Sequence, residues 1–156
     1  MANLTGSPQV FHGNTTTTDA TAQVPVGTRG FDNAGGEFIY LLGTASTTAG
    51  TWVTYNVSTP YTELLAADGI GAVAIAGTSI TAGLYGWYQI FGKNTQAKTD
   101  TIAANKPLYI DGTNGRADDA DVAGDTIYGA FSLTADTSNV ATVFLMYPRV
   151  TDAAAD

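Results

Sequence analysis

The chain has 156 residues and contains no cysteine, one histidine and only two glutamates. The missing cysteines exclude disulfides and thiolate metal sites. The single histidine, His12, lies in a segment without periodic pattern, where no rigid neighbour holds its tautomer for a catalytic triad or a metal cluster. A glycosidase needs two carboxylates fixed across a cleft. Glu37 and Glu63 are the only glutamates, and the aspartates lie in turns, where they bond to the backbone. A polysaccharide hydrolase is therefore the weakest alternative. We therefore predict a protein that is not an enzyme and binds no cofactor and no metal.

Charge is also scarce, since charged residues make up 13% of the chain against about 25% in ordinary soluble domains. Six lysines and arginines stand against 14 acidic residues, which gives a formal net charge of −8. The basic residues are scattered singly, whereas a nucleic-acid partner requires a basic face. We therefore predict no nucleic-acid partner. A surface with few charges loses little hydration on contact, which favours permanent packing against other protein chains.

Long apolar runs are absent too, because none approaches the ~20 residues that span a bilayer. The first residues show neither a basic stretch nor an apolar core of the kind found in signal peptides. We therefore expect no membrane association and synthesis in a cytoplasm. The length fits a single domain.

Residues 1–35 are rich in glycine and threonine, and their apolar residues are isolated. Such a segment cannot bury enough surface to fold alone. Its apolar anchors are nevertheless more than a disordered tail requires: Val10, Phe11, Val24 and Val26. We predict an extended N-terminal arm over residues 1–35 that packs on a neighbouring chain, a β domain over residues 36–150, and a polar tail over residues 151–156.

From residue 37 onward, short runs of aromatic and β-branched residues alternate with turn signals, which is typical of strands. The predicted strands are 37–42, 52–55, 72–76, 87–91, 107–110, 126–133 and 140–147. We expect the first two of these strands to form a hairpin with a long loop and the last two to form a second hairpin. One short helix is predicted after the second strand. Thr59 suits its N-cap, Pro60 its first helical position and Asp68-Gly69 its end. The fold class is therefore all-β: a single small antiparallel barrel or sandwich with one short helix.

Two features remain open to a binding role. Residues 118–125 hold four aspartates, whose oxygens suit Ca²⁺, although the order of an EF-hand loop is missing. A solvated acidic loop is the alternative. Four aromatic residues suit a core, a subunit interface or a platform for sugar rings: Trp52, Tyr85, Trp87 and Tyr88. We predict an interaction surface from them, with sugar binding as the alternative.

Several segments resemble a family of small proteins encoded in tailed phages and prophages. They are Gly36–Leu41, Gly50–Tyr55, Leu84–Lys93 and Asp119–Asp125, the last followed by Tyr128–Ala130. The resemblance covers roughly residues 24 to 152. It implies a β-rich head decoration protein, or cement protein, that clamps major capsid subunits together on the exterior of the virion.

Three further expectations come from this resemblance. The partners are the major capsid protein and further copies of the chain, in a homotrimer. The protein stabilises the capsid by bridging its subunits. No catalytic residue carries over from the family. The alternative function is a sugar-binding head-fibre or tail component.

Overall fold

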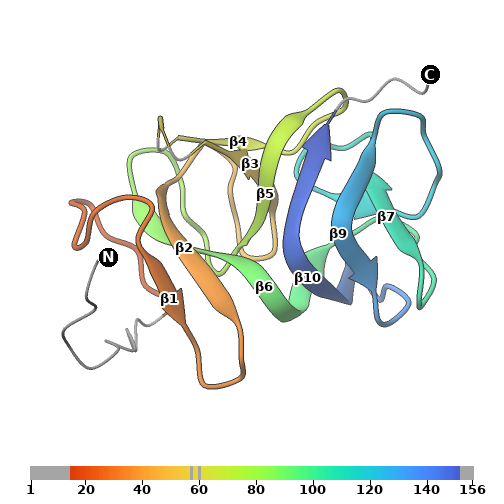
Figure 1. Cartoon of the computed structure of the whole chain (residues 1–156), viewed down its shortest axis with the longest axis horizontal. Coiled ribbons are helices and arrows are strands. Elements are labelled where there is room, and N and C mark those ends of the chain that lie inside the picture. Colours follow the sequence, from red (N-terminus) through yellow and green to blue (C-terminus); the bar gives the residue numbers. More distant parts are fainter. Residues whose placement is uncertain (1–14, 57, 60, 152–156) are drawn as a thin grey trace, which may run out of the picture.

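The computed structural model describes residues 15–56, 58–59 and 61–151, and within these ranges no residue is helical. The described residues form ten strands (Figure 1). Their bounds are β1 Arg29–Phe31, β2 Glu37–Leu42, β3 Trp52–Tyr55, β4 Thr62–Leu64, β5 Ile70–Ala76, β6 Tyr85–Lys98, β7 Pro107–Ile110, β8 Ala117–Asp118, β9 Thr126–Ser132 and β10 Val140–Thr151. The all-β prediction is confirmed.

The strands form one antiparallel sheet in the order β1-β2-β6-β5-β10-β9-β7-β8, with β3 joined to β5 and β4 joined to β3. Strand β6 pairs with β2 and β5 through its first half and with β10 through its second half. The sheet is not closed, so the barrel is not confirmed. Two isolated parallel bridges add to the ladder: Leu42 at the end of β2 pairs with Tyr61 before β4, and Thr99 after β6 pairs with Ala117 of β8.

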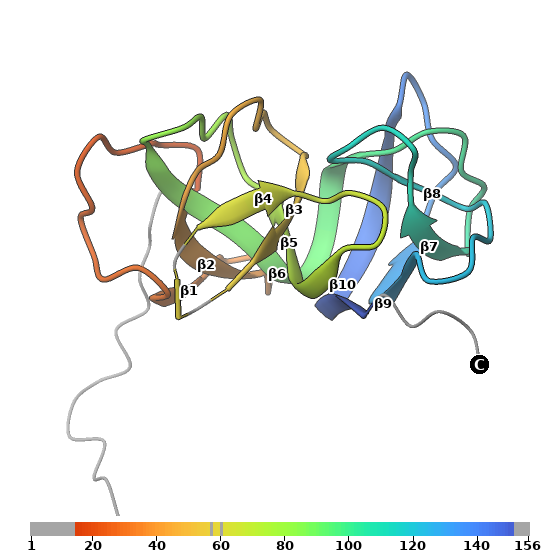
Figure 2. The same cartoon turned by 90° about the horizontal axis from the view of Figure 1, so that it is seen from above.

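Two hydrophobic cores lie on opposite sides of β3 and β5. Trp52, Val73 and Ile75 face one core, which continues under β7, β9 and β10. Val53 and Ala74 face the other, which lies against β2 and the first half of β6. Successive side chains of a strand point to opposite faces, so both faces of β3 and β5 are covered, as the two groups of strands in Figure 2 show. This explains the unbroken apolar run in β5.

The strand predictions are confirmed for β2, β3 and β7, and within one or two residues for β5 and for β9 with its hairpin to β10. The sequence underestimated β6 and β10. Strand β6 continues through a polar stretch to Lys98, and β10 continues past Pro148 to Thr151. Both extensions are held by neighbouring strands rather than by their own apolar pattern.

Two local predictions were wrong. The segment predicted as a helix instead forms β4 and a turn, in which the Gly69 N–H donates to the Ala66 carbonyl at 3.1 Å. Pairing with β3 gives the backbone of β4 hydrogen-bond partners along one side, and the buried Thr62 and Leu65 contribute to the packing. Pro60, the predicted first helical residue, lies outside the described residues. The predicted hairpin is also absent, because β2 pairs with β1 and β6 rather than with β3.

The segment predicted as an arm lies against its own chain from residue 15 onward. Asp19 exchanges two backbone hydrogen bonds with Tyr85, at 2.9 and 2.8 Å, and its carboxylate accepts a hydrogen bond from the Tyr40 hydroxyl at 2.7 Å. Val24 and Val26 each pack against a buried cluster. The predicted anchors Val10 and Phe11 lie outside the described residues. Between residues 15 and 31, the neighbour that orders the segment is the β domain itself.

Candidate interaction surface

The four aromatic residues singled out in the sequence do not form a shared exposed surface. Trp52 and Tyr88 are fully buried, and Trp87 is 7% exposed. Tyr85 is half-buried and stacks on Tyr40, with ring centroids 6.0 Å apart. Trp52 is part of one hydrophobic core. Its indole N–H donates to the Lys98 carbonyl at 2.9 Å, so the polar atom of this buried side chain has a partner inside the protein. The interaction surface must be sought among other side chains.

A β-bulge in β10 exposes two large side chains in succession. Residues 146–148 of β10 stand opposite the single residue Gly129 of β9. Met146 and Tyr147 are consequently 47% and 51% exposed, where a regular strand buries one of two neighbours. Tyr147 has a φ of +51°, a conformation that costs energy for a residue with a side chain. Gly129 is required opposite, since a Cβ there would lie 2.7 Å from the Met146 carbonyl oxygen.

Tyr147 is fixed by a buried carboxylate. Its hydroxyl donates to Glu37 Oε2 at 2.6 Å, and Arg29 pairs with Glu37 Oε1 at 3.0 Å. The Arg29 guanidinium also lies over the Tyr147 ring, 5.8 Å from its centroid. The hydrogen bond to the Glu37 carboxylate raises the pKa of Tyr147, because the phenolate would be a second anion beside the first. These contacts tie the bulge to the β1–β2 hairpin and hold the Tyr147 ring in one place.

Aromatic rings continue from Tyr147 across three strands. Phe91 of β6 contacts Tyr147 and Phe144, with ring centroids 5.3 and 5.8 Å apart, and Phe144 of β10 contacts Phe131 of β9 at 5.8 Å. The three phenylalanines are half-buried. Contacts of this kind stabilise by about 0.5–1.5 kcal/mol each beyond the area they bury, so the row gives Tyr147 a rigid base.

A second arginine stacks on a second tyrosine beside the bulge. The Arg149 guanidinium lies over the Tyr128 ring, 5.6 Å from its centroid, and Tyr128 is 44% exposed. A groove of about 570 Å³ separates Arg149 from Arg29. Tyr55 and Ile70 line this groove, and Ile70 is 72% exposed.

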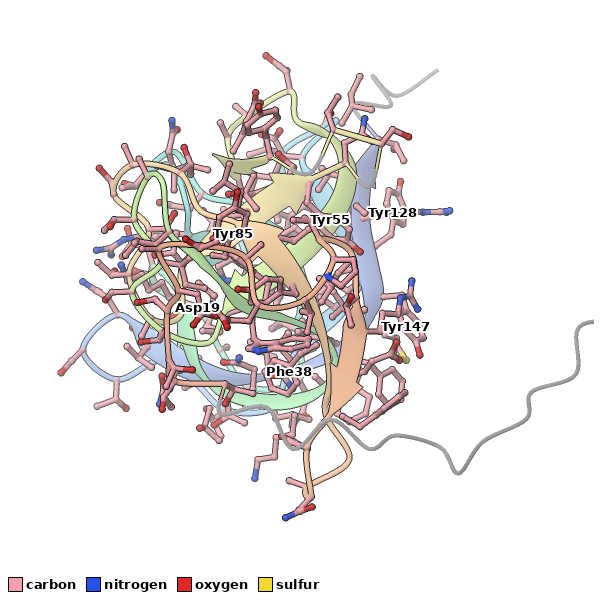
Figure 3. All side chains as sticks on the ribbon, turned by 90° about the vertical axis from the view of Figure 1, so that its left-hand side faces the viewer. Asp19, Phe38, Tyr55, Tyr85, Tyr128 and Tyr147 are labelled. Carbon is pink, nitrogen blue, oxygen red and sulfur yellow. The ribbon has the colours of Figure 1, made fainter. Side chains whose placement is uncertain are left out.

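We call the exposed group around the bulge the Tyr147 face. It comprises Arg29, Tyr128, Met146, Tyr147 and Arg149. Figure 3 shows Tyr128 and Tyr147 projecting from the same side of the molecule, beside β10. The sequence reasoning missed this face. Pro148 in an otherwise regular strand pattern was the available signal, because proline inside a sheet is confined to edges and bulges.

The acidic run holds no metal cluster: in the described part of the chain, no three His, Cys, Asp or Glu side chains converge as metal ligands do. Its carboxylates bond to the backbone instead. Asp118 accepts from the Ala120 N–H at 3.2 Å, and Asp119 accepts from the Ala103 N–H at 2.9 Å. In the same ranges, no helix has the length and apolar character needed to cross a membrane.

Asp118 is expected to make stability depend on pH. Partial burial, followed by repulsion from Asp111, Asp119 and Asp100, raises the pKa of Asp118 to about 6. The folded state therefore holds this proton more tightly than the unfolded state, and the contribution to stability falls as pH rises from about 4 to about 6. Asp118→Asn should remove this loss and raise stability at pH 7.5 by on the order of 1 kcal/mol, after allowance for solvent screening of a partly exposed group.

Thermal melting of both proteins between pH 4 and pH 8 measures the effect. An increase of roughly 2–4 °C in the melting temperature is expected at pH 7.5, and none at pH 4. The control is Glu63→Gln, which removes the charge of an exposed side chain in β4. An unchanged or lowered melting temperature for Asp118→Asn at pH 7.5 would contradict the prediction.

Comparison with known proteins gives no relative: no family model, no curated protein and no solved structure matches this chain. The function of the chain is therefore inferred from its surface geometry and from the sequence resemblance described above.

Proposed function

We propose that this chain is a structural virion protein that decorates and stabilises a tailed-phage capsid, and that the Tyr147 face is its contact surface. The observation that carries a contact role is the bulge. Tyr147 occupies an unfavourable backbone conformation. That conformation places its side chain at the surface rather than in the core. Backbone strain of this kind persists mainly where function requires it. The capsid as the site of action rests on the sequence resemblance.

The mechanism of such a protein is added buried area between subunits that must resist internal pressure. Apolar burial contributes about 25 cal/mol per Å², and a symmetric shell repeats that contribution at many positions. With a net charge of −8, the chain is suited to the exterior, because packaged DNA would repel it from the interior. The low charge content favours permanent attachment.

A sugar-binding role would need other residues than the four first considered, because two of them are fully buried. The strongest remaining location is a groove of about 360 Å³ beside β4, where Tyr61 and Glu63 are exposed. A discrete, saturable ligand in a glycan-array screen would favour this alternative over the structural role.

The proposal is tested on particles from the phage or prophage that encodes the chain. The protein should co-purify with DNA-filled particles at a constant ratio to the major capsid protein. Particles lacking it should release their DNA at a lower temperature. Replacing Tyr128 and Met146 by serine should reduce occupancy about tenfold or more, since each truncation of a central contact costs roughly 1–2 kcal/mol.

Val140→Ser is the matched control, because Val140 is 38% exposed at the opposite end of β10. It should leave occupancy unchanged. Absence of the chain from purified particles, or a ratio that varies from one preparation to another, would contradict the capsid role.

A further inference from the structure

One edge of the sheet has no neighbour in the part of the chain that the structure describes. Strand β1 stands at the end of the strand order and pairs with β2 alone (Figure 1). The outer edges at β4 and β8 differ, because Tyr61 before β4 bridges to Leu42, and Ala117 of β8 bridges to Thr99. An uncovered strand edge presents backbone donors and acceptors with which another strand can pair. Strand β1 is therefore the position where the sheet can be extended.

Hydrogen bonds between β1 and β2 alternate along the chain. The Tyr40 N–H donates to the Thr28 carbonyl at 2.9 Å, and the Asp32 N–H donates to the Gly36 carbonyl at 2.9 Å. Antiparallel strands exchange such bonds at every second residue. Gly30, midway between Thr28 and Asp32, therefore also bonds to β2. The ladder with β2 thus uses the backbone groups of these alternate residues.

The remaining residues of β1 direct their backbone groups away from β2. They are Arg29 and Phe31, and no other described residue bonds to their N–H or carbonyl groups. Their side chains are exposed too, with Phe31 at 53%. Gly30 between them has no side chain. The free edge therefore presents a donor and an acceptor on either side of a glycine.

This edge is complementary to itself. When two copies of β1 run antiparallel about a two-fold axis at Gly30, Arg29 of each copy stands opposite Phe31 of the other. Each outward N–H then donates to an outward carbonyl of the second copy. The axis passes between the two glycines, so no side chain obstructs the approach of the strands there.

Charge does not oppose this contact, although each chain carries a net charge of −8. The Arg29 guanidinium pairs with Glu37 at 3.0 Å in its own chain, so these two charges balance each other beside the edge. Asp32 stands opposite Thr28 of the second copy in this register, and not opposite another carboxylate. Its carboxylate also accepts a hydrogen bond from the Gly36 N–H at 2.6 Å.

We infer that two copies of this chain pair through β1, in the register centred on Gly30, and continue the antiparallel sheet from one copy into the other. This contact is additional to the proposed capsid contact and does not depend on it, because it is made by backbone groups of a strand edge. It forms a dimer, whereas the family resemblance implies a homotrimer.

Amide hydrogen exchange of the full-length wild type, followed by NMR, tests the register. At hundreds of micromolar, the Arg29 and Phe31 amides should exchange slowly, because each donates across the axis. Dilution to the monomer should accelerate both by about tenfold or more. The Gly30 amide is the internal control. It should remain protected at both concentrations, since it donates to β2.

Phe31→Pro removes an outward N–H that β2 does not use, and sheet edges tolerate proline. The melting temperature should therefore stay within a few degrees of that of the wild type. Phe31→Val is the matched control, because it also lacks the ring but keeps the N–H. Sedimentation should give the valine variant a dissociation constant within about fivefold of the wild type. The proline variant should be about 30-fold weaker than the valine variant, because a hydrogen bond is lost at both symmetric positions.

A monomeric wild type at hundreds of micromolar, a trimeric mass, or equal dimerisation of the proline and valine variants would each overturn the pairing. Rapid exchange of the Arg29 and Phe31 amides at every concentration would do the same. Protection of these amides only on capsid particles would assign the edge to a capsid strand and overturn the second copy as partner. A monomer that still occupies particles leaves the capsid role intact, and a dimer absent from particles leaves the pairing intact.

Discussion

Gly50→Ala is expected to prevent stable folding. A Cβ at residue 50 would lie 1.7 Å from the Gln96 carbonyl oxygen, and φ there is +78°. The clash is with backbone, so no side chain can move to relieve it. Gly50 also joins two strands, because its N–H donates to the Ala76 carbonyl at 2.9 Å and its carbonyl accepts from the Lys98 N–H at 2.9 Å. Moving the backbone to accommodate the methyl group breaks both bonds.

The expected loss exceeds about 4 kcal/mol, a range that single substitutions reach through a few mechanisms, of which strain at a special backbone conformation is one. Urea unfolding and the yield of soluble protein measure it. Gly83→Ala is the matched control, since φ is +82° there and no atom lies within 4 Å of the added Cβ. That variant should lose only about 1 kcal/mol from its backbone conformation. Equal stability of the two variants would show that the close approach at Gly50 does not exist.

Trp52→Ala should be the most damaging truncation in the core. Trp52 is the first residue of β3 and is fully buried. Its indole N–H donates to the Lys98 carbonyl at 2.9 Å. Truncation leaves a cavity and an unsatisfied buried carbonyl, and large aromatic truncations of this kind cost about 3–5 kcal/mol. Urea unfolding should show the midpoint falling accordingly.

Trp52→Phe separates the two parts of this effect, because it fills much of the cavity but donates no hydrogen bond. It should lose less than the alanine variant, with the hydrogen bond contributing about 1–3 kcal/mol. Under a sugar-binding role for Trp52, the alanine variant would instead keep its stability and lose ligand binding. A stability change below about 1 kcal/mol for Trp52→Ala would contradict the core assignment.

The sequence alone determined the class of fold and the position of most strands. Runs such as Phe38–Leu42 and Val143–Leu145 are strands because β-branched and aromatic side chains suit a pleated, half-buried surface, and this preference acts over a few residues. Turn chemistry is equally local: Asp111 accepts from the Thr113 N–H at 2.7 Å, in the glycine-bounded turn that the sequence indicated. The absence of cysteine likewise settled that packing, not disulfides, holds the domain together.

Only the tertiary structure decided which strands pair and which aromatic residues are exposed. Trp52 and Tyr147 are both aromatic residues within strands, yet one is fully buried and the other is 51% exposed. The difference comes from contacts distant in the chain. Trp52 meets Lys98, and Tyr147 meets Glu37 across the sheet. Burial depends on the pairing of β3 with β5 and on the bulge opposite Gly129, and local preferences cannot specify either.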